Sequence, residues 1–499
     1  MILVTENHDF HYETANICRF FVPDEKIKTV KERPADAGDE LLAVTTLLES
    51  ETGAKTVCKL QYGDFCEMRT SFVPAENTHY RDDCERTLAT DLYHLFCTLF
   101  ETTQSWGILT GVRPIKLLRR TVNEIGLSAA LDRFRSVWLC DEQKLALAEK
   151  TLRRENEILA LSRPDSFSLY ISIPFCPTRC DYCSFVSHTV DRAAYLIPDY
   201  LRLLCEEIRE TARLTKRLGL HLETVYVGGG TPTTLDAAQM TTLLTAVSDA
   251  FDLSNVREFT VEAGRPDTVA EEKLRAIKSA GIERISINPQ TLHNSVLAAI
   301  GRKHTVEEFY NAYDLARKIG FSVINTDLIT GLPTDTVDGF AATLDGILAL
   351  DPENVTVHTL SMKHGSNLVA SRRFEIAEKT AEAKAMSALA VEKLTAAGYD
   401  PYYLYRQGRT MGNQENVGYA KPGCEGLYNV YIMDETHTIL GCGAGAVTKL
   451  KQPDGEYIER IFNYKFPYEY VSGFPEMLAR KAGIDDFYTR FPAKKREEK

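Results

Sequence analysis

Three cysteines lie close together in the chain, at Cys176, Cys180 and Cys183. Thiolates at such spacing can hold one soft metal centre. A cubane iron–sulfur cluster has four irons, so three thiolates would leave one iron open to bind a ligand and pass it an electron. Unrelated buried thiols are the less favoured interpretation, because the other cysteines are scattered singly. A zinc site with His188 as a fourth ligand stays an alternative.

The segments around these cysteines alternate between short apolar runs and amphipathic stretches. Strands are expected at 169–173, 224–227, 258–262, 284–288, 323–328 and 354–359. Helices are expected at 197–218, 237–251, 270–280, 306–319 and 337–350, and a long helix at 377–397. This alternation predicts right-handed βαβ units and a parallel sheet, either a partial or full barrel or an open doubly wound sheet.

Polar or glycine-rich features follow each of these strands. The cysteines follow the first strand, and Gly228, Gly229 and Gly230 follow the second. Later strands end at side chains that can bind a ligand, namely Glu262, Asn288, Gln290, Asp327 and His358. Ligands bind at the carboxyl ends of strands in barrels and open α/β sheets. We therefore expect one ligand site at this edge.

Two of these features have a direct chemical interpretation. The glycine run lets backbone amides approach a ligand, but it lacks the spacing of a dinucleotide-binding turn, and a simple tight turn is the alternative. Glu262 could accept hydrogen bonds from both hydroxyls of a ribose, and an ordinary salt bridge is its alternative.

Composition sets broad limits on the 499-residue chain. We expect its first 165 or so residues to form a separate unit, with strands at 1–5, 55–60 and 67–72 and helices at 87–102 and 141–161, followed by a linker at 162–166. Late in the chain, short strands such as 429–433 are expected. The net charge of -12 weighs against a nucleic-acid partner. No apolar run suits a membrane span and no secretory signal is visible, so we expect a cytoplasmic, reducing location.

The cysteine triplet resembles the signature of the radical S-adenosylmethionine (SAM) superfamily. The segments 170–176, 228–233 and 324–333 look like those of the oxygen-independent coproporphyrinogen III oxidase family. The segments 107–114, 261–267, 285–290 and 402–407 are similar to its HemZ branch, coproporphyrinogen dehydrogenase. The resemblance runs through nearly the whole chain, including the N-terminal unit.

The resemblance implies an α/β fold. Its parts are an α+β N-terminal domain (1–165), a partial (β/α)6 TIM-like radical SAM barrel (166–365) and a C-terminal α/β extension over the barrel mouth (366–499). It implies a 4Fe-4S cluster on Cys176, Cys180 and Cys183, with S-adenosyl-L-methionine beside it. The implied cofactor or substrate contacts are Tyr170, Tyr182, Gly229, Gly230, Thr231, Glu262, Gln290, Arg302 and Asp327. Among these, Tyr182 would pack near adenine, and Tyr170 near the methionine end.

The resemblance also implies a reaction, the oxidative decarboxylation of coproporphyrinogen III to protoporphyrinogen IX in haem biosynthesis. An electron donor of flavodoxin or ferredoxin type and an electron acceptor would be needed. Phe185 stands where better-known oxidases carry a further cysteine, and the haem-chaperone branch also has Phe there. A haem chaperone without oxidase activity is therefore the alternative. A radical enzyme acting on RNA is a third hypothesis, against which the acidic balance weighs.

Several weaker candidates remain. His304, His358 and His364 could be functional, although a lone histidine is more often structural. An aromatic and basic stretch could line a tetrapyrrole pocket or simply pack a helix, and its members are Tyr402, Tyr403, Tyr405, Arg406 and Arg409.

Overall fold

The computed structural model describes residues 1–493 apart from 24, 35–37, 184–186, 362–372 and 409. The chain forms two compact units. The first comprises Met1–Ala148, Val369–Ala381 and Arg406–Glu415, and the second comprises Glu149–Leu368, Glu382–Tyr405 and Asn416–Lys499. No helix of the described residues is long and apolar enough to cross a membrane. The domain boundaries at 165 and 365 stay predictions.

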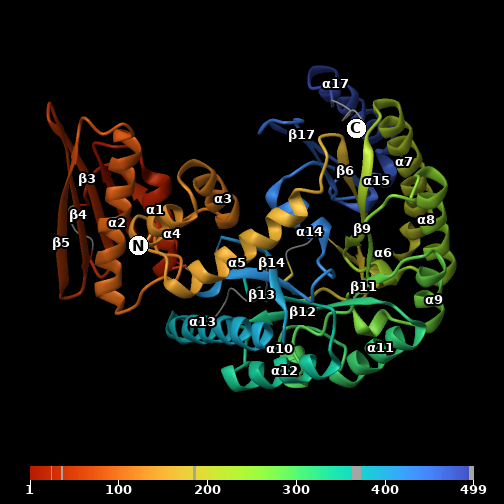
Figure 1. The fold of residues 1–499 in the computed structure, drawn as a ribbon. Coiled ribbons are helices and arrows are strands. Elements are labelled where there is room, and N and C mark those ends of the chain that lie inside the picture. The colour runs from red at the N-terminus through yellow and green to blue at the C-terminus, as the bar shows by residue number, and fades with distance from the viewer. Residues whose placement is uncertain (24, 35–37, 184–186, 362–372, 409, 494–499) are drawn as a thin grey trace. The chain divides into compact units, whose positions relative to one another are not determined.

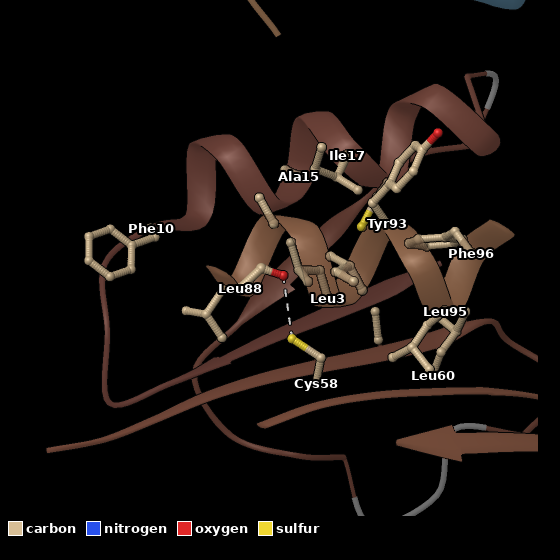
Figure 2. Packing of buried hydrophobic residues seen from close by; sticks show 14 of the residues in the cluster. Leu3, Phe10, Ala15, Ile17, Cys58, Leu60, Leu88, Tyr93, Leu95 and Phe96 are labelled. Atoms are coloured by element: carbon tan, nitrogen blue, oxygen red, sulfur yellow. Dashed lines mark hydrogen bonds between the residues drawn. The ribbon is translucent and has the colours of Figure 1, made fainter. Parts of the chain in front are cut away.

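The first unit contains a five-stranded sheet covered by helices. Its strands lie in the order β2 (Lys28–Val30), β1 (Ile2–Glu6), β3 (Leu42–Ser50), β4 (Gly53–Tyr62) and β5 (Phe65–Pro74). Helices α1 (His11–Phe21) and α2 (Tyr80–Phe100) pack against it. Figure 2 shows Leu3, Ile17, Leu88 and Phe96 in the buried layer between them, where the Cys58 thiol donates to the Leu88 carbonyl. The helices α3 (Pro114–Ile125) and α4 (Leu127–Ser136) follow in this unit, and α5 (Glu142–Leu159) begins in it and ends in the second unit.

The second unit is built on six neighbouring parallel strands, as the sequence predicts. They are β6 (Ser166–Ile173), β9 (His221–Gly229), β10 (Glu258–Glu262), β11 (Arg284–Ser286), β12 (Val323–Thr330) and β13 (Asn354–Thr359). Each is paired in parallel with the next. Their largely buried, apolar sequences are typical of parallel strands covered on their faces.

Connecting helices lie on the outside of this curved sheet (Figure 1). They are α7 (Ile197–Leu218), α8 (Ala237–Ala250), α9 (Glu271–Ser279), α11 (Val306–Ile319) and α12 (Val337–Leu350), with the short α10 (Asn294–Ala299) before α11. Capping boxes fix where two of them begin. Asp236 and Gln239 cap α8, and Thr305 and Glu308 cap α11.

C-terminal elements extend both edges of the sheet. At the β13 edge, β15 (Glu415–Ala420) pairs antiparallel with β13, and β14 (Asp400–Arg406) lies beyond it after the long helix α13 (Arg373–Ala396). At the β6 edge come β16 (Thr438–Cys442), β17 (Val447–Lys451) and β18 (Ile458–Phe462), followed by α15 (Pro467–Ser472), α16 (Phe474–Ala479) and α17 (Ala482–Arg490). In the part of the chain that the structure describes, β6 and β13 do not pair, so the barrel is partial, as expected.

One expected strand is wrong. The segment 429–433 lies inside helix α14 (Leu427–Asp434). The Glu258 carboxylate at the start of β10 accepts hydrogen bonds from the backbone amides of Leu427 and Tyr428 and so caps the first turn. Tyr428 and Tyr431, three residues apart, are both buried. A tertiary contact and helical burial outweigh the β-propensity of this tyrosine-rich segment.

Candidate active site at the carboxyl edge of the sheet

The cysteine loop follows β6 directly. Its first residues form β7 (Phe175–Cys176), which pairs with β8 (His188–Thr189), and the Cys183 amide donates to the Cys180 carbonyl at 3.1 Å. Cys180 is buried, whereas Cys176 and Cys183 are half-buried. The Thr231 hydroxyl, after β9, donates to the Cys176 sulfur at 3.5 Å. The ends of β6 and β9 thus meet around one cysteine.

Two buried arginines approach the Cys180 sulfur. Arg265 Nη1 lies 3.4 Å from it and Arg302 Nη1 lies 3.9 Å from it. Arg265 is also held by Asp267 through two hydrogen bonds of 2.9 and 2.8 Å. Both guanidinium groups therefore lie where they can donate hydrogen bonds to a sulfur that binds iron.

Arg302 differs from Arg265 in its partners. Its other donors go to the Tyr182 hydroxyl at 3.0 Å and to the carbonyls of Gly264 and Asn288 at 2.8 and 2.5 Å. No carboxylate of the described residues forms an ion pair with it, although it is only 7% exposed. Burial works to lower the pKa of Arg302, but Tyr182 and Cys180 hold that pKa above its ordinary value. The site therefore keeps a buried positive charge that thiolates and a bound anion can balance.

The glycine turn after β9 brings the backbone close to this loop. A Cβ on Gly230 would stand 2.6 Å from the Phe175 carbonyl oxygen and 3.0 Å from the Cys176 sulfur. Gly229 has φ +109°, a conformation that side chains rarely adopt. The close approach requires glycine at both positions, which accounts for the run.

Glu262 lies beside a stack of three tyrosines. The Tyr226 hydroxyl donates to its carboxylate at 2.5 Å. The Tyr226 ring stacks on Tyr428 at 4.5 Å, and both stack on Tyr170 at 6.4 and 6.0 Å respectively. Burial raises the pKa of Glu262 to about 7 against the lowering effect of the Tyr226 hydrogen bond. The carboxyl is therefore poised to be a donor or an acceptor near neutral pH.

Asp327 and Gln290 lie on neighbouring strand ends. Asn325 donates to Asp327 at 2.8 Å, and His358 Nε2 is 3.7 Å from its carboxylate. Burial works to raise the pKa of Asp327, but His358 and Asn325 hold it below its ordinary value. Gln290 has φ +70°, and its buried side-chain oxygen has no hydrogen-bond partner in the described structure. Such a strained, unsatisfied amide is typical of a ligand site.

The structure gathers the expected residues in two clusters. One contains Cys176, Cys180, Tyr182, Thr231 and Arg302, and the other contains Tyr170 and Glu262. His358 joins Asp327. His304 accepts from Arg302 at 3.3 Å, and burial, with Arg302 and Arg265 nearby, lowers its pKa to about 3.

Other expected candidates lie elsewhere. Arg406 belongs to the first unit, where it donates to the carbonyls of Leu109 and Gly111. Its guanidinium is thus occupied by the backbone rather than presented to a ligand. Tyr402 and Tyr403 are buried in the second unit. Phe185, His364 and Arg409 lie outside the described residues.

Sequence reasoning missed Arg265, Tyr226 and Tyr428. Arg265 lies close in the sequence to Glu262 and Asp267, and this proximity was a signal that could have identified Arg265 as a site residue. Tyr226 lies on β9 opposite Tyr170, and only the strand register reveals that pairing. Tyr428 comes from a helix that was expected to be a strand, so no sequence signal pointed to it.

This arrangement fits an iron–sulfur cluster with a polar ligand beside it. In a cubane each thiolate binds a different iron, so the three cysteines need not converge on one point. Three features suit a polar ligand at this edge. They are the arginine that donates to the Cys180 sulfur, the glycines that lie close against the cysteine loop, and the Gln290 oxygen without a hydrogen-bond partner in the described structure.

Comparison with known proteins decides the family. The model of the radical SAM superfamily matches residues 170–347. The chain is 36% identical over 486 residues to the oxygen-independent coproporphyrinogen-III oxidase-like protein HemZ of Bacillus subtilis, covering 95% of each chain. The chain belongs to this family of radical SAM proteins. Members of the superfamily use a 4Fe-4S cluster and SAM, as the resemblance implied.

Two further proteins are similar to this chain over more than half of its length. The heme chaperone HemW of Bacillus subtilis is 32% identical over 311 residues, which are 60% of this chain and 77% of HemW. The solved structure of coproporphyrinogen III oxidase (HemN) of Escherichia coli has a TM-score of 0.50 and 23% identity, covering 64% of this chain and 72% of HemN. The latter confirms the radical SAM fold.

Replacing each loop cysteine by alanine tests the cluster ligands. We expect Cys176→Ala, Cys180→Ala and Cys183→Ala each to lose the cluster in anaerobically prepared protein, because the remaining two thiolates cannot hold it. Iron and sulfide content and the visible absorption spectrum measure this. Cys205→Ala, which removes another buried thiol of the same unit, is the matched control. A full cluster in any of the three variants would refute that ligand.

Glu262 gives a prediction about pH and stability. Its pKa of about 7 exceeds the ordinary 4.5, so the folded protein retains a proton that the unfolded chain loses. The contribution of Glu262 to stability therefore falls as pH rises from about 4.5 to about 7. At pH values above about 7 we expect Glu262→Gln to have a higher thermal denaturation midpoint than wild type. At pH values below about 4.5 we expect the two midpoints to be equal. Glu206→Gln, at an exposed site on α7, is the control. Parallel pH profiles for Glu262→Gln and wild type would contradict the shift.

Proposed function

We propose that the protein converts coproporphyrinogen III to protoporphyrinogen IX without oxygen, as a step of porphyrin and haem biosynthesis. The observation that carries this proposal is the extent of the similarity to HemZ, 95% of both chains, which includes the first unit. The HemW similarity covers only 60% of this chain.

The positions of the side chains support the proposed roles. Cys176, Cys180 and Cys183 hold the cluster. Gly229, Gly230 and Thr231 lie against Cys176 and offer backbone and hydroxyl groups to the methionine end of SAM. The remaining proposed cofactor or substrate contacts are Tyr170, Tyr182, Glu262, Gln290, Arg302 and Asp327.

The cluster and SAM would supply a 5′-deoxyadenosyl radical, which takes a hydrogen atom from the β carbon of a propionate before carbon dioxide and one electron are lost. The protein must orient both reactants and exclude water. The stacked rings of Tyr170, Tyr226 and Tyr428 provide an apolar wall beside Glu262. Arg302 fixes Cys180 and Tyr182 in place.

The proposal has further requirements. A one-electron donor of flavodoxin or ferredoxin type must reduce the cluster, and a separate acceptor must take the substrate electron. A cytoplasmic location would supply both SAM and a reducing environment for the free thiols.

A haem chaperone is the second candidate function. It is favoured by the match to HemW, at 32% identity over 77% of that protein. A chaperone of this kind would bind and transfer haem and would not decarboxylate coproporphyrinogen.

One anaerobic assay separates the two candidates. Cluster-loaded protein is reduced with one equivalent of dithionite and mixed with SAM, coproporphyrinogen III and a one-electron acceptor, and the porphyrin and nucleoside products are separated by chromatography. A parallel sample is incubated with haem instead of coproporphyrinogen III and desalted, and the haem that it retains is measured. We expect protoporphyrinogen IX, 5′-deoxyadenosine and methionine to form, and Cys180→Ala to form none of them. Stable haem retention with no decarboxylation would overturn the oxidase and support the chaperone.

A further inference from the structure

The strand β5 forms one edge of the sheet in the first unit (Figure 1). It is ten residues long, and its register with β4 runs without a bulge from Phe65 to Pro74. It contains no lysine, and its only proline is its last residue. An edge strand presents a row of backbone N–H and C=O groups on the side away from its neighbour. The backbone of β5 can therefore pair with a further strand along most of its length.

The opposite edge of the same sheet is different. It is formed by β2, which has only three residues and begins with the exposed Lys28. A short edge strand and an exposed lysine both prevent the addition of another strand. The sheet is thus protected at the β2 edge and open at the β5 edge.

The outer face of β5 is apolar at two exposed positions. Ser71 donates to Asp91 of α2 at 3.1 Å and Val73 packs in the core, so the odd-numbered residues of β5 face α2. Because side chains alternate along a strand, the even-numbered residues face away from α2. Among them Met68 is 64% exposed and Phe72 is 56% exposed. An exposed apolar edge strand of this length is an association surface.

Two opposite charges on β5 make that surface complementary to itself. Glu67 is exposed and forms no ion pair within the described residues, and the side chain of Arg69 is half exposed, 3.5 Å from Asp91. Antiparallel pairing of β5 with its own copy, centred on Met68, places each Glu67 opposite the Arg69 of the other copy. Centring the pairing on Glu67 or on Arg69 would instead place like charges opposite each other, which is destabilising. The charges therefore select one register.

We propose that β5 pairs antiparallel with β5 of a second copy of this chain, centred on Met68, so that the two five-stranded sheets form one continuous sheet. A two-fold axis through Met68 makes the interface the same surface on both copies, which is the commonest symmetry of protein dimers. Main-chain hydrogen bonds provide the affinity, as in other cases of strand addition. The two pairs between Glu67 and Arg69 set the register, and Met68 packs against its own copy. The proposal concerns the first unit and holds for either candidate function.

Disulfide formation in the full-length protein tests the register. In the proposed pairing Thr70 lies opposite the exposed Cys66 of the second copy. We expect Thr70→Cys to give a covalent dimer through Cys66 when oxidised glutathione is added, because opposite residues of paired strands are close enough for a disulfide. Thr70→Cys combined with Cys66→Ser is the matched control and should give no such link, since the two introduced thiols lie four residues apart along the strands. Mass spectrometry identifies the linked cysteines. A link between the two introduced thiols in the control would overturn the register.

Sedimentation of the anaerobically prepared, full-length protein tests the dimer itself. Glu67→Arg places like charges opposite each other at two positions and should weaken the dimer on the order of tenfold at low salt. Glu32→Arg, an equal charge reversal at an exposed position after β2, is the matched control and should leave the dimer unchanged. A monomeric wild-type protein at micromolar concentration would overturn the proposal and indicate another occupant of the β5 edge. Equal dimer affinities for Glu67→Arg and Glu32→Arg would also overturn it.

Discussion

The site depends on one buried cation, the guanidinium of Arg302. It is 7% exposed and forms no carboxylate ion pair within the described residues. Its hydrogen bonds hold together the Cys180 sulfur, the Tyr182 hydroxyl and the carbonyls that follow β10 and β11. An isolated buried charge is costly, so the loop is arranged for thiolates and an anionic ligand to compensate it. Arg302 thereby links the cysteine loop to two strand ends.

The parallel sheet makes this arrangement possible. Six adjacent strands end at the same edge, so residues far apart in the chain come together without long loops. The glycine turn after β9 then closes the gap to Cys176 because no side chain intervenes. Glu258 at the opposite end of β10 caps α14 and so helps to place Tyr428 against Tyr226.

Much of the second unit could be predicted from the sequence. The strands β10 and β13 and the helices α7, α11 and α12 have the expected bounds, because buried strands and capped helices leave periodic patterns. The register of the strand pairings, the tyrosine stack and the second arginine at Cys180 could not be predicted. They arise from register and from contacts between distant residues, as Tyr170 and Tyr226 show. The helix α14 was missed because its cap comes from another strand.

We propose that three cysteines leave one iron of a 4Fe-4S cluster open for SAM beside Arg302. Electron paramagnetic resonance of the reduced, anaerobic protein with and without SAM tests it most directly. We expect a cluster signal whose g values shift when SAM is added, since SAM would bind the open iron. A cluster signal that SAM leaves unchanged would show that no iron is open to SAM.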